Sequence, residues 1–473
     1  MKVKALVFCL GLLSAVCPFD VQSQQQWNLP LLARWDDDSI PQAWTGAYSE
    51  CGGYADDSGR EYAYIGSTKG IYFFDITDPE NPVQVGYFTT KDTAVVVVNK
   101  DFAVYSHYVY AVSDQGDNSL QIFDMQYLPD SVVKVYDSNA LSKRAHTLFV
   151  EKDRLYVCSN SRPDNSFGAM DVFSLADPLD PQLLGTLFNP GFFTVHETFV
   201  RNDTAWCANG NSGMWVYDMS DPAFPSLISY IDLYPEEGYN HSGWLSADSK
   251  TLYFTDENHG KGVKVYDVSD AASPELKQIF RSNLLNVPDP QSSNGSVAHN
   301  PFIRDDKLFV AYYHDGVQVY DLSDPWQPEL IGYYDTYPEN DTYYSYAGCW
   351  GVYPFLPSGT IIASDIKNGL ILLDGRGVLG YEPEVPVPGG IQIAGNPVTD
   401  WLTMNFFLEE EGVVDFEVFD VTGRLVHTGS YDADEGNSTV TWNVSSLSSG
   451  IYYIRGRSSG WKETLKMLKV PSR

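Results

Sequence analysis

Four histidines recur at one phase of the chain, and imidazole is the side chain best suited to proton transfer or metal binding near neutral pH. Each of them comes just before a similar apolar segment. They are His146 in RAHTLFV, His196 in TVHETFV, His241 in YNHSGW and His299 in VAHNPF. The whole chain has only eight histidines. Half of them at one phase indicates a common structural position.

Three other residues share that phase, which predicts a ring of seven side chains around one axis. They are Cys51 in SECGG, Asp101 in NKDFAV and Cys349 in AGCWGV. Converging imidazoles could bind a transition metal or act as general base on a substrate. The candidates for catalysis are His196, His241 and His299. The alternative is that each histidine bridges its neighbours through backbone hydrogen bonds, and it is favoured because metal ligands must lie about 2 Å from a single ion.

Two acidic segments could hold calcium, because clustered carboxylate and amide oxygens suit that ion. They are Asp256-Glu257-Asn258-His259 and Asp114-Gln-Gly-Asp-Asn118. Neither has the spacing of a defined calcium loop, so solvated turns are the preferred interpretation. The candidate ligands for any metal, calcium or a transition metal, are His146, His196, His241, His299, Asp101, Asp256 and Glu257. The sequence assigns no other cofactor.

Aromatic residues crowd one region, where exposed rings could stack on a sugar or contact a protein partner. They are Tyr337, Tyr343, Tyr344, Tyr346, Trp350 and Tyr353. The chain has no nucleophile elbow, no phosphate-binding glycine loop, no HExxH and no CxxC pair. None of these common motifs is therefore available to support an enzymatic function.

The elements that would position these residues come from a repeated clause, seen in VQVYDLSDPWQPELIGYY at 317–334. Two apolar segments flank an Asp- and Pro-containing turn, in which the Asp carboxylate accepts backbone N–H groups two residues on. The clause Asp falls at Asp75, Asp124, Asp218, Asp267, Asp321 and Asp374, with Ser174 in its place once. Seven copies at about fifty residues each predict a seven-bladed, all-β propeller.

The first strand is expected to close the propeller. The last clause ends at 370–374 without a following strand, and Leu29–Asp36 resembles the strand that follows the sixth clause. If Leu31–Trp35 lies anywhere but beside 370–373, the propeller prediction fails. Closure would put Cys51 and Cys349 in neighbouring blades, so we predict a disulfide between them. Cys158 and Cys207 are expected to be buried thiols.

The ends and the charge of the chain indicate export. Residues 1–23 have the basic start, short apolar run and small-residue site of a signal peptide. No other segment is apolar enough to cross a membrane. A formal charge of −32 excludes nucleic acid as a partner. We therefore divide the chain into a signal (1–23), a propeller (24–380), a Pro-rich linker (381–390) and a small β-sandwich (391–473).

The sandwich resembles the C-terminal sorting domain of the type IX secretion system of Bacteroidota-type bacteria. The matching motifs are NPVTDWL at 396–402, FDVTGR at 419–424, LSSGIY at 447–452 and KMLKV at 466–470. Their marker residues are Asn396, Pro397, Asp420, Gly423, Gly450 and Lys466. Ala394-Gly395 departs from the Tyr-Pro common in the family. The resemblance implies the secretion machinery as a partner, and a secreted or outer-membrane-surface location.

The body resembles LVIVD-repeat propellers, and within them the choice-of-anchor B group. The YDLSDP clauses, GYNHSGWL at 238–245 and VAHN at 297–300 carry this likeness. The family brings no established activity. Two functions stay open: a binding, adhesion or scaffold module for an extracellular protein or carbohydrate, and a metal-assisted hydrolase or lyase at the channel mouth. The favoured interpretation is the binding, adhesion or scaffold module.

Overall fold

The computed structural model describes residues 26–43, 46–191, 193–381, 391–393, 398, 400–408 and 410–470. The expected signal peptide lies outside them, as does most of the expected linker. The described chain divides into two compact units, with the boundary between Val378 and Leu379. Strands dominate both units, and the helix α1 (Arg376–Leu379) is a single turn. None of the described helices has the length and apolarity needed to span a membrane.

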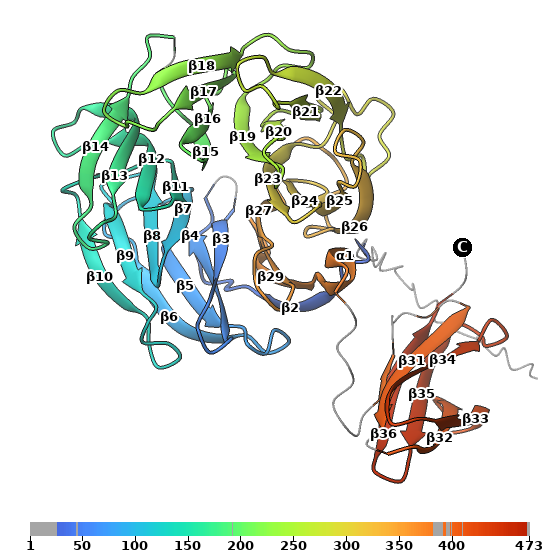
Figure 1. Ribbon diagram of the computed structural model, residues 1–473. Helices are drawn as coiled ribbons and strands as arrows, with labels where there is room; N and C mark the ends of the chain where they lie inside the picture. The colour runs from blue at the N-terminus through green and yellow to red at the C-terminus, as the bar shows by residue number, and fades with distance from the viewer. Residues whose placement is uncertain are drawn as a thin grey trace, which may run out of the picture. The chain divides into compact units, whose positions relative to one another are not determined.

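The first unit consists of seven antiparallel sheets arranged around a central channel (Figure 1). The first four blades are β3 (Tyr48–Ala55), β4 (Glu61–Ser67), β5 (Gly70–Asp75) and β6 (Val83–Thr89); β7 (Lys100–Tyr105), β8 (Tyr108–Ser113), β9 (Leu120–Asp124) and β10 (Val133–Ser138); β11 (Thr147–Glu151), β12 (Arg154–Ser161), β13 (Phe167–Ser174) and β14 (Gln182–Leu187); and β15 (Glu197–Arg201), β16 (Thr204–Ala208), β17 (Met214–Asp218) and β18 (Ser226–Ile231).

The remaining three blades follow the same order. They are β19 (Asn240–Leu245), β20 (Thr251–Asp256), β21 (Val263–Asp267) and β22 (Glu275–Phe280); β23 (Ala298–Arg304), β24 (Lys307–Tyr312), β25 (Gly316–Asp321) and β26 (Glu329–Tyr334); and β27 (Cys349–Tyr353), β28 (Thr360–Asp365) and β29 (Gly369–Asp374) with β2 (Leu31–Trp35). The first strand of each blade packs against that of the next, and β27 packs against β3. These seven innermost strands form a closed ring.

The predicted closure is confirmed. Leu31 pairs with Leu373 and Trp35 with Leu370, so the N-terminal strand β2 is the outer strand of the last blade. This covers the edge of β29, which would otherwise present unpaired backbone groups. A second N-terminal strand, β1 (Gln26–Trp27), pairs with β26 and adds a fifth strand to the sixth blade.

The repeated clause forms the turn that the sequence predicts. In each of the six Asp-containing copies, the carboxylate accepts a hydrogen bond from the backbone N–H two residues on, as Asp321 does from Ser323 at 2.8 Å. Ser174 does the same with its hydroxyl. The strand that enters each turn is a nearly continuous apolar run, such as LILL at 370–373. It is buried on both faces by the neighbouring blades.

Strand direction gives the propeller two different faces. The loop face lies where the innermost strands begin, and it carries the connections between blades and the loops between second and third strands. The turn face lies at the opposite ends, and it carries the tight first hairpins and the clause turns. Long connections such as 335–348 are on the loop face. Recognition residues are commonly carried by such loops on a rigid scaffold.

The second unit is a two-sheet sandwich. One sheet is β30 (Ile391–Ile393), β31 (Trp401–Leu408) and β34 (Gly436–Asn443), and the other is β32 (Gly412–Asp420), β33 (Leu425–Ala433), β35 (Gly450–Arg457) and β36 (Lys462–Lys469). Its core includes Phe406, Phe416 and Trp442. Asp420 accepts backbone N–H groups from Thr422 and Arg424 around the turn at Gly423. Gly450 and Lys466 lie in β35 and β36, and Asn396 and Pro397 lie outside the described residues.

Candidate functional site

The four histidines form one continuous row at the loop-face end of the channel. His146 Nε2 lies 2.8 Å from His196 Nε2, and successive ring centroids along the row are 4.1, 4.3 and 4.2 Å apart. Each ring comes from a different blade, at the start of its innermost strand. The structure therefore brings together the four imidazoles that share one phase of the sequence. We call this set the histidine row.

Burial keeps most of the histidine row neutral. Loss of hydration, with repulsion between neighbouring imidazoles, lowers the pKa of His196 and His241 well below the usual range. Burial also lowers the pKa of His299 to about 3. A neutral imidazole has one nitrogen free to bind a metal and one N–H to donate. These three rings are therefore in the form that binds metals.

Hydrogen bonds occupy only part of the histidine row. His299 Nδ1 donates to the backbone carbonyl of Trp350 in the next blade. This is a hydrogen bond between neighbouring blades, as the structural interpretation of the histidines expects. His146 Nδ1 lies 3.1 Å from Asp114 Oδ2. Nδ1 of His196 and of His241 is buried and has no hydrogen-bond partner among the described residues. The middle of the row therefore retains unused ring nitrogens.

The other predicted ring members do not join the row. Lys100 directly precedes Asp101, as His146 precedes Thr147, and its ammonium group is buried beside Ser113 at 3.3 Å. The ring that meets His299 in the seventh blade belongs to Trp350, with centroids 5.0 Å apart, and not to Cys349. Cys51 and Asp101 line a separate cavity further along the channel.

The register of the innermost strands explains this, and only some of these strands contain a β-bulge. In β3, β19, β23 and β27 the register of pairing with the second strand of the blade shifts by a bulge near the start of the strand. One example is the shift between Asn240 and Ser242. A bulge places two consecutive residues opposite one. In the regular strands β7, β11 and β15, equivalent positions are held by Asp101, Thr147 and Glu197, which pair with Val112, Cys158 and Ala208. Asp101 therefore corresponds to Glu197, not to His196.

The predicted disulfide is not formed. Cys51 and Cys349 are free thiols, as are Cys158 and Cys207, and all four are buried. The Cys51 sulfur lies 4.0 Å from the carbonyl of Ile362, and the Cys349 sulfur lies 3.6 Å from that of Gly351. Each thiol is thus directed at backbone of the seventh blade, rather than at the other sulfur. Burial raises the pKa of each, which makes them unreactive.

One group of described residues has ligand atoms close enough for a metal ion. One atom from each of His196, His241 and Glu257 lies within 4.8 Å of the other two. Tetrahedral bonds of about 2.0–2.2 Å place ligand atoms about 3.3–3.6 Å apart, so the widest pair must close by more than about 1 Å to hold zinc. Asp256 is elsewhere, in a fully buried ion pair with Lys264. Asp101 is in the separate cavity.

A pocket of about 410 Å³ opens on the loop face beside this group. Its walls are largely aromatic, with two amides and the Glu257 carboxylate. The lining residues are Val98, Asn211, Tyr239, Glu257, Asn258, Tyr313, Tyr346 and Trp350. Tyr346 and Trp350 belong to the aromatic region noted in the sequence. We call this cavity the loop-face pocket.

The remaining aromatic residues of that region do not line it. Tyr343 is buried, and its hydroxyl donates to Asp315 at 2.7 Å. Tyr337 stacks with the Lys367 ammonium, and Tyr353 lines the other channel cavity. Tyr344 is 76% exposed on the surface. The region therefore divides among core, surface and two separate cavities.

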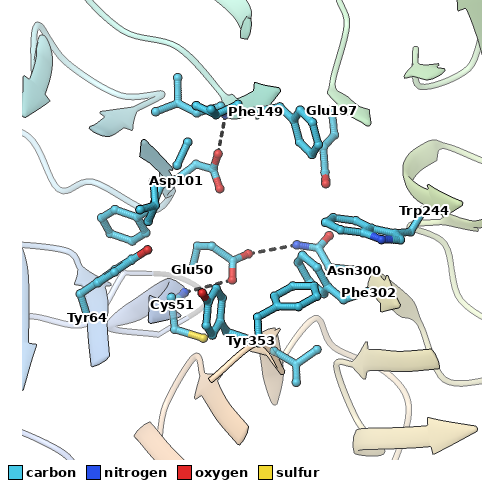
Figure 2. Close-up of a pocket in the computed structure, with 18 residues that line it drawn as sticks. Glu50, Cys51, Tyr64, Asp101, Phe149, Glu197, Trp244, Asn300, Phe302 and Tyr353 are labelled. Carbon is cyan, nitrogen blue, oxygen red and sulfur yellow. Dashed lines mark hydrogen bonds between the residues drawn. The ribbon is translucent and has the colours of Figure 1, made fainter. Parts of the chain in front are cut away.

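Further along the channel is a second cavity of about 200 Å³, which we call the channel chamber (Figure 2). The carboxylates of Glu50, Asp101 and Glu197 point into it, together with the Asn300 amide. The residues two positions after these, and after their equivalents, face the same side of the innermost strands. They include the aromatic residues Phe149, Trp244, Phe302 and Tyr353, and the small residues Gly52 and Ala103, which leave the space open.

Glu50 is buried and Asp101 and Glu197 are partly buried, so all three chamber carboxylates have lost part of their hydration. Burial, with repulsion from Asp101, raises the pKa of Glu50 to about 8. Burial also raises the pKa of Asp101 to about 7. The pKa of Glu197 is raised well above its usual range by burial and by the charges of Asp101 and Glu50. Such shifts are typical of functional sites.

The sequence analysis missed Glu50, Glu197 and Asn300. Glu197 and Asn300 directly follow two of the singled-out histidines, and Glu50 directly precedes Cys51. A strict two-residue alternation turns neighbours to opposite sides of a strand, so the histidine phase predicts that these residues face away from the channel. Adjacency to a histidine, for Glu197 and Asn300, was the one available signal.

Two family models match the chain. A secretion system C-terminal sorting domain matches residues 393–470, and an LVIVD repeat matches residues 53–90. The chain therefore carries an LVIVD repeat in its first blade and a type IX sorting domain after the propeller. The sorting domain directs export through the type IX system, to the cell surface or the extracellular space of a Bacteroidota-type bacterium. It also implies contact with the secretion machinery. These conclusions agree with the resemblances stated from the sequence.

Solved structures similar to this chain are distant. PorZ, an essential surface component of the type IX secretion system of Porphyromonas gingivalis, is 11% identical with a TM-score of 0.48. The alignment covers 92% of this chain but only 61% of PorZ, so the chain spans less than two thirds of that protein. A Lactobacillus plantarum protein is 12% identical, with a TM-score of 0.49 and 84% and 98% of the two chains covered. No curated protein matches the chain in sequence.

Proposed function

We propose that this exported propeller is a binding module, and that its ligand is a carbohydrate held in the loop-face pocket. The observation that supports this is the combination of aromatic rings with amide and carboxylate groups around a cavity of about 410 Å³. Sugar rings have apolar faces that stack on Tyr and Trp, and hydroxyl rims that bond to amides and carboxylates. The pocket lies among inter-blade loops, on a rigid closed ring of strands.

Individual contacts fit this role. Tyr313 donates its hydroxyl to Glu257 at 2.7 Å, which fixes the carboxylate at the pocket floor. Asn258 accepts the backbone N–H of Tyr239, which fixes the amide orientation. Trp350 and Tyr346 are only partly buried and present their rings to the pocket. Pre-set polar groups reduce the entropy lost on binding.

The test is binding of the mature chain to an oligosaccharide panel. For any sugar that binds, Trp350→Ala should weaken affinity at least tenfold, because truncating a central Trp of a binding site costs about 2 kcal/mol or more. Trp326→Ala is the matched control, since Trp326 is 45% exposed in a clause turn on the turn face. Trp350 also contacts His299 and Tyr313, so Tyr346→Ala provides a second variant.

Three outcomes decide the proposal. A loss in both pocket variants with none in Trp326→Ala supports it. Wild-type protein that binds no oligosaccharide overturns it. Equal affinity of the wild-type protein and a folded Trp350→Ala or Tyr346→Ala variant also overturns it.

The geometry of His196, His241 and Glu257 favours a second candidate, a metal-assisted hydrolase or lyase. Three protein ligands with a further position open is the usual form of a catalytic zinc site. Glu257 also lines the loop-face pocket, so a substrate there would lie next to the ion. A zinc ion at such a site supplies a water molecule that ionises near neutral pH.

Zinc binding separates the two candidates. If the site holds zinc, the mature chain should retain about one equivalent after dialysis, and His241→Ala should weaken binding at least a hundredfold. His107→Ala is the control, because His107 lies away from the histidine row and pairs with Asp124. Metal content is measured by mass spectrometry and affinity by competition with a chelator. Zinc bound equally by wild type and His241→Ala would exclude the metal-assisted candidate.

A further inference from the structure

The channel chamber has a charge imbalance within its own walls. Glu50, Asp101 and Glu197 point into one space (Figure 2), and none of the residues that line it is Lys, Arg or His. Glu50 is only 7% exposed. Unpaired carboxylates in a poorly hydrated space are costly unless a cation or a proton neutralises them. The described residues that line the chamber therefore provide no cation.

The existing hydrogen bonds leave acceptor capacity directed into the chamber. Asn300 is 6% exposed and donates its Nδ2 to Glu50 Oε2 at 3.0 Å. Its Oδ1 is buried and has no hydrogen-bond partner among the described residues. Glu197 accepts one hydrogen bond, from Ser242, and Asp101 accepts from the backbone of Leu148. A buried acceptor without a donor points to a ligand that carries N–H groups.

The rest of the wall is aromatic. Trp244 lies 6.1 Å from Phe149, 5.1 Å from Phe302 and 5.8 Å from Phe355 between ring centroids, so these rings form a continuous surface. Ammonium groups are attracted to the faces of Trp, Tyr and Phe, most strongly where water is excluded. Carboxylates, an amide oxygen and aromatic rings together select a positive charge with an apolar body.

We propose that the channel chamber binds a small organic ammonium ion, a protonated primary amine. Its N–H groups bond to the carboxylates and to Asn300 Oδ1, and its hydrocarbon part lies against the aromatic wall. The chamber volume of about 200 Å³ accommodates a short alkyl chain rather than a peptide or an oligosaccharide. The site is separate from the loop-face pocket, so either proposal can fail alone.

The test compares n-butylammonium with n-butanol, which has a similar chain and no charge, by calorimetry in a buffer free of amines. The wild-type mature chain should bind butylammonium at least tenfold more tightly than butanol. Glu197→Gln should lose at least tenfold in butylammonium affinity, because it removes one chamber charge. Glu275→Gln is the control, since Glu275 is an exposed strand carboxylate.

Dependence on pH gives an independent readout. The titratable groups that face the chamber are Glu50, Cys51, Tyr64, Asp101, Glu197 and Tyr353. The pKa values of Asp101 and Glu50, about 7 and about 8, mean that these carboxyls are largely protonated at pH 6. A cation binds the ionised forms, so affinity should rise at least tenfold from pH 6 to pH 8.5. Butylammonium itself stays charged throughout.

Several results would overturn the proposal. They are equal affinity for the amine and the alcohol, no binding of either, unchanged affinity in folded Glu197→Gln, or an affinity that falls as pH rises. Displacement of the amine by Ca²⁺ at equal concentration would assign the carboxylates to a metal instead. A folded Glu197→Gln protein is recognised by an unfolding transition as cooperative as that of the wild type.

Discussion

Replacing Trp35 with alanine should lower the free energy of unfolding by about 3 kcal/mol, the usual cost of removing a large aromatic side chain from a packed site. Trp35 ends the N-terminal strand that closes the propeller, and it pairs with Leu370. Its ring lies 4.7 Å from both Tyr72 and Phe74, between the seventh blade and the first. The substitution would therefore remove packing at the point where the first and last strands of the propeller are joined.

The matched control for this prediction is Trp27→Ala. Trp27 is also near the N-terminus, but it lies on β1, is 46% exposed and meets only the edge of the sixth blade at Tyr333. Its removal should cost less than about 1 kcal/mol. The measurement is urea unfolding of the mature chain followed by circular dichroism. Equal effects of the two substitutions would show that closure by β2 contributes little to stability.

Glu50→Gln should make the propeller more stable than wild type at high pH, by roughly 3–5 kcal/mol at pH 9. In the folded protein the pKa of Glu50 is raised to about 8, from about 4.5 in the unfolded chain. Between these values the folded state holds a proton that the unfolded chain has released. Wild-type stability therefore falls as pH rises through this window, whereas a neutral glutamine does not titrate.

The local contacts allow the substitution. Glu50 accepts from the backbone N–H of Cys51 and from Asn300 Nδ2. Glutamine keeps the first contact through its oxygen, and its amide N–H can bond to Asn300 Oδ1 once that side chain rotates. The two proteins should have similar stability at pH 5.

Unfolding free energies at pH 5 and pH 9 test this second prediction. Glu80→Gln is the control, because Glu80 is exposed in a clause turn, and it should stay within about 0.5 kcal/mol of wild type at both values. Parallel pH dependence of wild type and Glu50→Gln would contradict the prediction. The expected result would also mean that the ionised Glu50 carboxylate lowers the free energy of unfolding. A binding role for the chamber would explain why such a destabilising group is present.

Local chemistry explains why so much of the fold was readable from the sequence. The clause turn depends on an Asp, or once a Ser, whose side chain accepts the backbone N–H two residues on, and each copy forms this hydrogen bond. The closing strand was recognisable because Leu29–Asp36 repeats the pattern of an outer strand. The sorting domain was recognisable from short motifs in a fixed order. All of these signals lie within short segments of the chain.

The sequence by itself thus determined the seven blades, their closure, the sorting tail and the convergence of four histidines. Only the tertiary structure decided which neighbours share the channel. A bulge inserts one residue into one strand and changes which side chains face inward, and no residue type marks its position. In β7, which has no bulge, Lys100 holds the position of the histidines, so Asp101 lies with Glu50 and Glu197. Glu257 and His241 belong to the fifth blade, and they meet His196 of the fourth only because the two blades converge on the channel.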